Sequence, residues 1–225
     1  MPCAGCGRQY DIALFQFGRT ISCTCGARVG ATERVRTADQ SSEPRFAADA
    51  MLGRLARWLR ALGYDTAYES DIPDAELVRL AILERRCILT RDRALPEEWR
   101  VDNVMLIGAN APLDQLAEVV AAFDLDYHTH LFTRCTICNL PVVEVVKENV
   151  ADRIPPLVLA EHNAFWECRS CEKIYWKGSH VARMHRHLEQ LGRSRQGMGM
   201  NDERVHRRRL ARRSPGRQFG TSDPI

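Results

Sequence analysis

Three acidic residues in this chain stand where strands are predicted to give way to helices. Asp49 ends the short apolar run Phe46–Ala48, and Asp92 lies just beyond the run Cys87–Thr90, while Asp74 begins a predicted helix. In a parallel α/β sheet the carboxyl ends of the strands share one edge, so these carboxylates are expected to gather there. Like charges repel one another unless a cation lies among them, and carboxylate oxygens favour Mg²⁺ or Mn²⁺.

Two of these acids also suit an ordinary structural role. The segment Asp71–Asp74 fits a turn that leads into a helix, so Asp74 is suited to cap that helix, with or without a metal ion. Asp92 precedes a predicted helical turn through Trp99, which leaves the same alternative open. Asp49 is harder to explain in this way, because three acids after three strand–helix junctions are better explained by a shared ion.

The elements needed to position these acids form a predicted α/β domain over residues 45–125. Leucines recur at helical spacing over 51–62, and Gly63 follows where a C-terminal cap is wanted. The remaining predicted elements are helices over 74–85 and 112–123 and strands over 64–68 and 104–107. The expected fold class is therefore α/β, with a parallel sheet flanked by helices.

The helix that follows Asp49 carries an arginine at every third position: Arg54, Arg57 and Arg60. Because this helix begins beside Asp49, its first arginines are expected near the acids, where they would hold the phosphates on either side of a scissile bond. A solvated face, or pairing with surface acids, is the alternative, most of all for Arg60.

Eight of the nine cysteines form two sets whose spacing is typical of metal ligands. The first set lies in residues 1–30, with strands expected over 10–17 and 19–22, and the second lies in residues 132–191. Four thiolates around one ion make a tetrahedral Zn²⁺ site, so each segment is predicted to be a structural zinc ribbon. The predicted ligands are Cys3, Cys6, Cys23 and Cys25 in the first ribbon and Cys135, Cys138, Cys168 and Cys171 in the second.

The first set has an unusual feature, since one residue and not two separates Cys23 from Cys25. Two disulfides or a redox site are the alternatives there, and a reducing compartment argues against both. The ninth cysteine, Cys87, lies in an apolar run and is expected to fill the core. Residues 31–44 lack periodicity and are predicted to be a linker that tethers the first ribbon.

The chain of 225 residues is long enough for one α/β domain and small additional modules. Its net charge is only +3, but eight arginines fall between positions 193 and 213, so residues 192–225 are predicted to be a disordered basic tail. Such a tail favours a polyanion such as RNA, and a solvated tail without a partner is the alternative. Neither a signal peptide nor a membrane span is expected, which predicts a cytoplasmic protein.

Three separated motifs carry a resemblance to a known family: Arg45–Arg60, Leu89–Arg93 and Tyr175–His180. They resemble the Mut-seven C-terminal ribonuclease domain, a member of the PIN-like superfamily, over residues 45–192. The resemblance implies a PIN-type α/β fold and a metal-dependent ribonuclease. It leaves the first ribbon and the basic tail uncovered.

The resemblance also implies a set of site residues. Asp49, Asp74 and Asp92 match the acidic positions, and Glu76 is an alternative to Asp74 in that role. A fourth acidic position has no clear match, and Asp114 or Asn110 is a candidate to approach the site. Arg91, beside Asp92, joins Arg54 and Arg57 as an expected substrate-binding residue. The implied partner is RNA, including tRNA or ribosome-associated RNA.

Two rival hypotheses stand beside the ribonuclease. One is a non-catalytic RNA- or ribosome-binding protein that keeps the PIN-like fold as a platform, and the other is a zinc-stabilised scaffold for protein interactions. A binding module has no need of three acids at one sheet edge, so their presence favours the enzyme.

Overall fold

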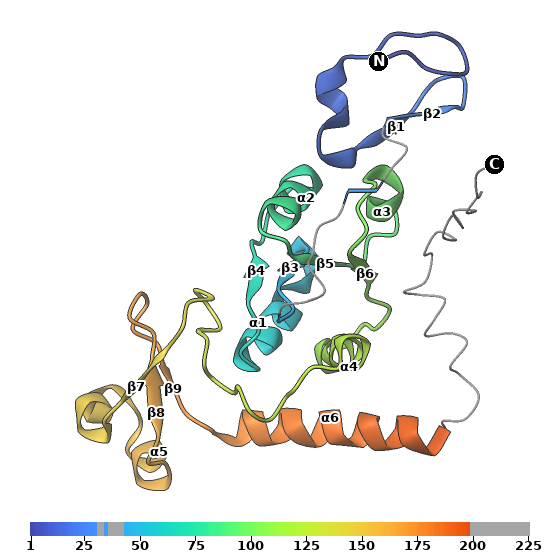
Figure 1. The fold of residues 1–225 in the computed structure, drawn as a ribbon. Helices are drawn as coiled ribbons and strands as arrows, with labels where there is room; N and C mark the ends of the chain where they lie inside the picture. The colour runs from blue at the N-terminus through green and yellow to red at the C-terminus, as the bar shows by residue number, and fades with distance from the viewer. Residues whose placement is uncertain (31–33, 36–42, 199–225) are drawn as a thin grey trace, which may run out of the picture. The chain divides into compact units, whose positions relative to one another are not determined.

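A four-stranded parallel sheet in the order β4-β3-β5-β6 forms the centre of the α/β domain (Figure 1). Ala48 of β3 stands in register with Tyr68 of β4 on one side and with Leu89 of β5 on the other. Every residue of β3 and β5 is buried, as expected of central strands covered on both faces. The strands are β3 (Phe46–Ala48), β4 (Thr66–Tyr68), β5 (Cys87–Thr90) and β6 (Val104–Leu106). The predicted α/β class with a parallel sheet is confirmed.

Helices cover both faces of this sheet, with α2 and α3 on one face and α1 and α4 on the other (Figure 1). On the first face Ala47 and Ile88 pack into one core with Leu77 of α2 and Leu95 of α3. On the second face the ring of Phe46 meets that of Phe123 edge-on, with centroids 5.1 Å apart. The elements are η2 (Ala50–Leu52), α1 (Gly53–Ala61), α2 (Asp74–Leu83), α3 (Leu95–Glu98) and α4 (Pro112–Phe123).

Two small modules built around cysteines complete the fold. The first contains η1 (Ile12–Gly18), β1 (Thr20–Ser22) and β2 (Arg28–Gly30), and the second contains β7 (Val143–Val145), η3 (Lys147–Arg153), α5 (Pro156–Glu161), β8 (Phe165–Glu167) and β9 (Ile174–Tyr175), followed by α6 (Ser179–Met198). The predicted strand over 10–17 is wrong. Asp11 starts a 3-10 helix there, because its carboxylate accepts a hydrogen bond from the N–H of Ala13 at 2.9 Å.

This computed structural model describes residues 1–30, 34–35 and 43–198, without the side chains of His180 and of residues 191–198. Contacts divide the chain into two units, Met1–His185 and Arg186–Ile225. Most of the predicted linker over 31–44, and residues 199–225 of the basic tail predicted over 192–225, lie outside the described residues. Residues 192–198 of that predicted tail belong to helix α6. Within the described part, no helix is both long and apolar enough to cross a membrane.

Candidate functional site

The carboxyl ends of β3 and β5 bring Asp49 and Asp92 to one edge of the sheet. Asp49 follows β3 and is only 7% exposed. Its Oδ2 accepts a hydrogen bond from the hydroxyl of Thr90, the last residue of β5, at 2.6 Å. The same hydroxyl accepts a hydrogen bond from the backbone N–H of Asp92 at 2.9 Å. Thr90 therefore connects the two acids, and it replaces part of the hydration that the buried carboxylate of Asp49 has lost.

Asp74, the first residue of α2, lies within electrostatic range of these two acids. Its pKa is raised, first by burial and then by the negative charges of Asp49, Asp92 and Glu98. A helix N-terminus favours the charged form of a carboxyl group, so desolvation and repulsion outweigh that effect at Asp74. The fold thus places four carboxylates in one neighbourhood, and one of them, Glu98 of α3, is additional to the predicted set.

The alternative of helix capping fits these acids unequally. Asp49 stands at the N-cap position of η2, but its side chain makes no capping bond. The N-cap of α2 is Pro73, so a capping role for Asp74 is wrong. Asp92 is different, because its Oδ1 accepts a hydrogen bond from the N–H of Ala94 at 2.7 Å and shapes the turn before α3.

A second acid of α2, Glu76, is paired within its own helix. Glu76 forms a two-bond ion pair with Arg79 of the same helix, with Oε2–Nε and Oε1–Nη2 distances of 2.8 and 2.6 Å. Glu76 is therefore bound to its own helix, whereas Asp74 is subject to the field of the other acids. Asp114 lies in the first turn of α4, and Asn110 precedes that helix.

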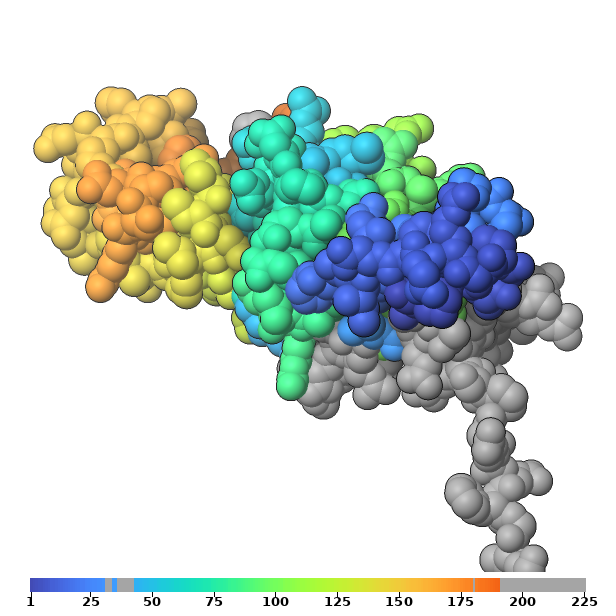
Figure 2. Space-filling view, turned by 90° about the horizontal axis from the view of Figure 1, so that it is seen from above, coloured from blue at the N-terminus to red at the C-terminus, as the bar shows by residue number. Residues whose placement is uncertain are grey.

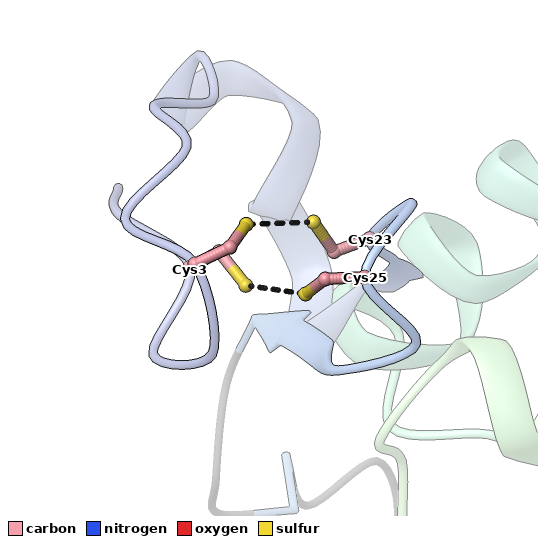
Figure 3. Close-up of side chains that lie close together, drawn as sticks. Cys3, Cys23 and Cys25 are labelled. Carbon is pink, nitrogen blue, oxygen red and sulfur yellow. Dashed lines mark hydrogen bonds between the residues drawn. The ribbon is translucent and has the colours of Figure 1, made fainter.

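The first cysteine tetrad consists of Cys3, Cys6, Cys23 and Cys25 (Figure 3). The Sγ atoms of Cys3 and Cys25 are 3.6 Å apart, and those of Cys6 and Cys23 are 3.5 Å apart. A disulfide needs about 2.05 Å, whereas four sulfurs at about 2.3 Å from one Zn²⁺ lie about 3.8 Å from each other. The N–H of Cys25 and then the hydroxyl of Tyr10 lower the pKa of Cys23 to about 5. At Cys25 the N–H of Ala27 favours ionisation, but the neighbouring sulfurs outweigh it and raise the pKa to about 11, so one thiolate of the set is favoured before a cation binds.

The second tetrad consists of Cys135, Cys138, Cys168 and Cys171, and it has a hydrogen-bonded support around it. The Sγ atoms of Cys135 and Cys171 are 3.6 Å apart. Burial opposes ionisation of Cys135, but hydrogen bonds from the N–H of Cys138 and the hydroxyl of Tyr175 outweigh it and lower its pKa to about 6. Both tetrads therefore fit a tetrahedral zinc ion.

The four cysteine turns share one backbone feature that explains the unusual spacing at Cys23. The residue after the second cysteine of each turn has a positive φ: Gly7 (73°), Gly26 (87°), Asn139 (61°) and Glu172 (57°). This left-handed residue lets the chain turn back around the sulfurs. In the turn that begins at Cys23 the left-handed residue, Gly26, lies three residues after the first cysteine, and in the other turns it lies four residues after it. The turn at Cys23 is therefore one residue shorter but ends in the same backbone conformation.

The chain was compared with protein families, with curated proteins and with solved structures. A model of the Mut7-C RNase domain matches residues 44–188. The chain belongs to the Mut7-C RNase domain family. This membership confirms the resemblance and indicates a nuclease-type role acting on RNA. The matched span holds the sheet, the acids and the second tetrad, and it excludes the first tetrad. No curated protein and no solved structure matches the chain.

The predicted substrate-binding arginines of the Mut7-C domain lie on its surface. Arg54 and Arg57 are exposed on α1, the helix that follows Asp49. Arg91 is also exposed, and its Nη2 donates a hydrogen bond to Oδ1 of Asn110 at 2.5 Å. Asn110 is therefore bound to this arginine and not to a carboxylate of the site.

Arg60 has a structural role in the Mut7-C domain, and the alternative of a solvated face or of pairing with surface acids is wrong for this residue. It is 5% exposed, and its Nη1 donates hydrogen bonds to the carbonyls of Thr136 and Ile137 at 3.1 and 2.8 Å. Those carbonyls belong to the first turn of the second tetrad. Asn139, which closes the same turn, donates to Oδ1 of Asp65 at 2.7 Å. The second ribbon is therefore fastened to the α/β domain.

Two residues near the acids of the Mut7-C domain were not singled out from the sequence. Thr90 is a polar residue at the buried end of an apolar strand, and that position between Asp49 and Asp92 was an available signal. Glu98 carries no such signal, because it lies in a four-residue helix with ordinary surface composition. The packing of α3 against α2 brings Glu98 toward Asp74, a contact between distant segments that local sequence does not indicate.

Proposed function

We propose that this protein is a divalent-metal-dependent ribonuclease that hydrolyses RNA phosphodiester bonds at Asp49, Asp74 and Asp92. The observation that carries the proposal is the hydroxyl of Thr90, which is bonded to both the carboxylate of Asp49 and the N–H of Asp92. The two tetrads would hold structural Zn²⁺, and Mg²⁺ or Mn²⁺ would be the catalytic ion.

The acidic residues suit a hard divalent cation in their chemistry. Carboxylate oxygens are the ligands that Mg²⁺ and Mn²⁺ prefer, and the raised pKa of Asp74 reports negative charge that a cation would neutralise. Among the described residues, the groups of three or more ligand atoms within 4.8 Å of one another are the two cysteine tetrads. The carboxylates of Asp49, Asp74 and Asp92 are therefore spaced more widely than the sulfurs of the tetrads.

Each residue then has a distinct task. When bound, a divalent cation lowers the pKa of a coordinated water and offsets charge on the phosphate. Asp49 and Asp92 would supply the inner carboxylates, while the hydroxyl of Thr90 fixes the orientation of Asp49. Asp74 is partly desolvated by its neighbours but still reaches solvent, and it would serve as an outer ligand or orient the attacking water. The exposed guanidinium groups of Arg54, Arg57 and Arg91 would hold the neighbouring phosphates.

Further parts of the proposal concern the partner and the location. We infer that the substrate is RNA, with tRNA and ribosome-associated RNA as candidate classes. The arginines between positions 193 and 213 would add affinity without sequence preference, and that affinity should fall with salt. None of the nine cysteines is in a disulfide, which suits a reducing compartment such as the cytoplasm.

The decisive variant is Asp49→Asn, which removes one charge at nearly constant shape. We expect the wild-type protein to cleave a generic RNA in the presence of Mn²⁺. The variant should cleave the same RNA at least about 100-fold more slowly, while it still binds it. The matched control is Asp71→Asn, which removes an exposed acid bonded to Ser70. Undiminished cleavage by Asp49→Asn would refute the assignment. RNA binding without cleavage by the wild-type protein would instead support the non-catalytic alternative.

A further inference from the structure

The first ribbon lies outside the family match, yet it is bonded to the short helix α3. The hydroxyl of Thr20 donates to the backbone carbonyls of Glu97 and Glu98 at 3.2 and 3.0 Å. The guanidinium of Arg28 donates to the same carbonyl of Glu97. Arg19 forms an ion pair with the carboxylate of Glu98, with an Nη2–Oε1 distance of 2.8 Å. We call Arg19, Thr20 and Arg28 the α3 clamp.

Helix α3 needs such support because it has only four residues, Leu95–Glu98. A helix this short does not persist alone in water, since nucleation costs more than one turn of hydrogen bonds returns. Its last carbonyls have no partner within the helix, and cationic side chains are favourable at that end. The α3 clamp supplies both the missing donors and the positive charge.

The segment held by the clamp carries two of the acids. Asp92 stands immediately before it and accepts the N–H of Ala94, and Glu98 ends it. The first ribbon also reaches the helix that carries Asp74, because Phe17 packs against the core shared by α2 and α3. Figure 2 shows the first ribbon, in dark blue, beside the blue-green surface of α2. One module therefore contacts both helices that position acids.

We propose that the first ribbon, through the α3 clamp, positions Asp92 and Glu98 and so sets the affinity of the acidic site for a divalent cation. This inference rests on the proposed function. Arg19 is a positioning residue in it, since it acts through Glu98 and α3 and not on the substrate. The ribbon would then be a built-in part of the nuclease and not a separate RNA-binding module.

The test is a Mn²⁺ titration of the full-length, zinc-loaded protein, with hydrogen exchange of the α3 amides as a second measurement. We expect the double variant Arg19→Ala/Thr20→Val to bind Mn²⁺ about tenfold more weakly. The amides of Glu97, Glu98 and Trp99, which donate within this segment, should exchange at least about tenfold faster. Zinc content should not change, because no cysteine is altered.

Two further variants test the location and the charge of the α3 clamp. Arg8→Ala removes an exposed arginine of the same ribbon outside the α3 clamp, and it should leave both measurements unchanged. Arg19→Lys keeps a positive charge beside Glu98 and should restore most of the Mn²⁺ affinity lost in Arg19→Ala.

The outcomes distinguish this inference from the proposed function. If wild-type protein binds Mn²⁺, Asp49→Asn does not, and the double variant binds as wild type does, the clamp proposal is overturned and the nuclease proposal stands. Faster exchange in α3 with unchanged Mn²⁺ affinity also overturns the clamp proposal, since the ribbon then supports only the fold. If wild type and Asp49→Asn bind Mn²⁺ equally, both proposals are overturned.

Discussion

The hydroxyl of Thr90 donates a hydrogen bond to the carboxylate of Asp49, with an Oγ1–Oδ2 distance of 2.6 Å, while it accepts the N–H of Asp92. One side chain at the end of β5 thus fixes the acid that follows the neighbouring strand β3. The parallel register explains this contact, because Ala48 pairs with Leu89 and the next residues on both strands lie at the same edge. The contact between Thr90 and Asp49 therefore depends on the order of the strands in the sheet as well as on the two residue types.

Replacing Thr90 by valine keeps the shape of the side chain and removes its hydroxyl. Asp49 then loses a donor and the N–H of Asp92 loses an acceptor, both in a partly or fully buried environment. We expect the free energy of unfolding to fall by about 1–3 kcal/mol and RNA cleavage to fall about 10–100-fold. Urea unfolding and a cleavage assay at saturating Mn²⁺ measure the two effects.

Thr90→Ser is the matched control, because it retains the hydroxyl and removes only a methyl group. It should keep cleavage within about threefold of wild type, since the bond to Asp49 can still form. Equal losses in the valine and serine variants would show that packing, and not the hydroxyl, is what matters at this position.

The raised pKa of Asp74 predicts a pH dependence of both metal binding and stability. Burial and then Asp49, Asp92 and Glu98 disfavour its charged form, so Asp74 takes up a proton at a higher pH in the folded chain than in the unfolded chain. Between those two pKa values the folded state binds more protons, so stability without Mg²⁺ or Mn²⁺ falls as pH rises through this window. The affinity for Mn²⁺ should change in the opposite direction. It should weaken as the pH falls through the pKa that Asp74 has in the folded chain, because a protonated carboxyl group is a poor metal ligand.

The variant Asp74→Asn tests whether the charge on Asp74 lowers the stability of the protein when no Mg²⁺ or Mn²⁺ is present. In buffer without Mg²⁺ or Mn²⁺ at pH 7, we expect the variant to melt about 1–3 °C above wild type, because repulsion among the acids is relieved. Added Mn²⁺ should stabilise wild type more than the variant. A lower Tm for Asp74→Asn without Mn²⁺ would show that its interaction with the N-terminus of α2 outweighs the repulsion.

The sequence predicted the sheet and the cysteine tetrads because their signals are local. Apolar runs such as Cys87–Thr90 and paired cysteines such as Cys135 and Cys138 mark a strand and a metal turn by spacing alone. The strand expected over 10–17 was wrong because a side-chain bond from Asp11 starts a helix there. Local hydrogen bonding at that site outweighs the apolar pattern.

The contacts that join modules could not be predicted in this way. Sequence analysis placed the first ribbon on a tether, whereas the structure bonds Arg19 to Glu98, which is 79 residues away in the chain. An arginine on a helix face also has the same local signal whether it is exposed, as Arg57 is, or buried, as Arg60 is. Which one is buried depends on carbonyls from a distant turn, and spacing carries no information about those.

Asp65 joins the α/β domain to the second ribbon, and its removal should lower stability. Burial opposes its ionisation, but hydrogen bonds from Arg86 and Asn139 outweigh that effect and lower its pKa to about 2. We expect Asp65→Asn to reduce the free energy of unfolding by about 2 kcal/mol, or about 4–8 °C in Tm. The reason is that Arg86, only 4% exposed, then loses a charged partner.

The pH dependence of this effect has a definite sign. A depressed pKa contributes stability that is complete above the unfolded value near 4 and is lost as pH falls toward 2. The difference in Tm between wild type and Asp65→Asn should therefore be constant from pH 8 to 5 and shrink below pH 4. Asp152→Asn, an exposed acid on η3, is the control and should change Tm by less than about 1 °C. A difference that is still undiminished at pH 2 would contradict the ion-pair explanation.

Tyr175 supports the second tetrad through its hydroxyl, and its replacement by phenylalanine should make that zinc more labile. The hydroxyl accepts the N–H of Thr136 at 3.0 Å and lies 3.1 Å from Sγ of Cys135, to which it can donate its own hydrogen when that sulfur is a thiolate. The ring stacks on Phe132 with centroids 5.9 Å apart, and phenylalanine keeps this packing. Since groups that orient metal ligands affect affinity about 10–100-fold, we expect one of two zinc equivalents to transfer to a coloured chelator about tenfold faster.

The first tetrad has no contact with this hydroxyl in the described structure, so the second zinc equivalent should leave at its wild-type rate. Tyr127→Phe removes a tyrosine hydroxyl outside both tetrads and serves as the matched control. Two equivalents released at wild-type rates from Tyr175→Phe would show that the N–H of Cys138, at 3.3 Å from Sγ of Cys135, suffices to hold the thiolate. Faster loss of both equivalents would mean that the two ribbons are coupled through the α/β domain, which the contacts of Arg60 and Arg19 at its two sides make possible.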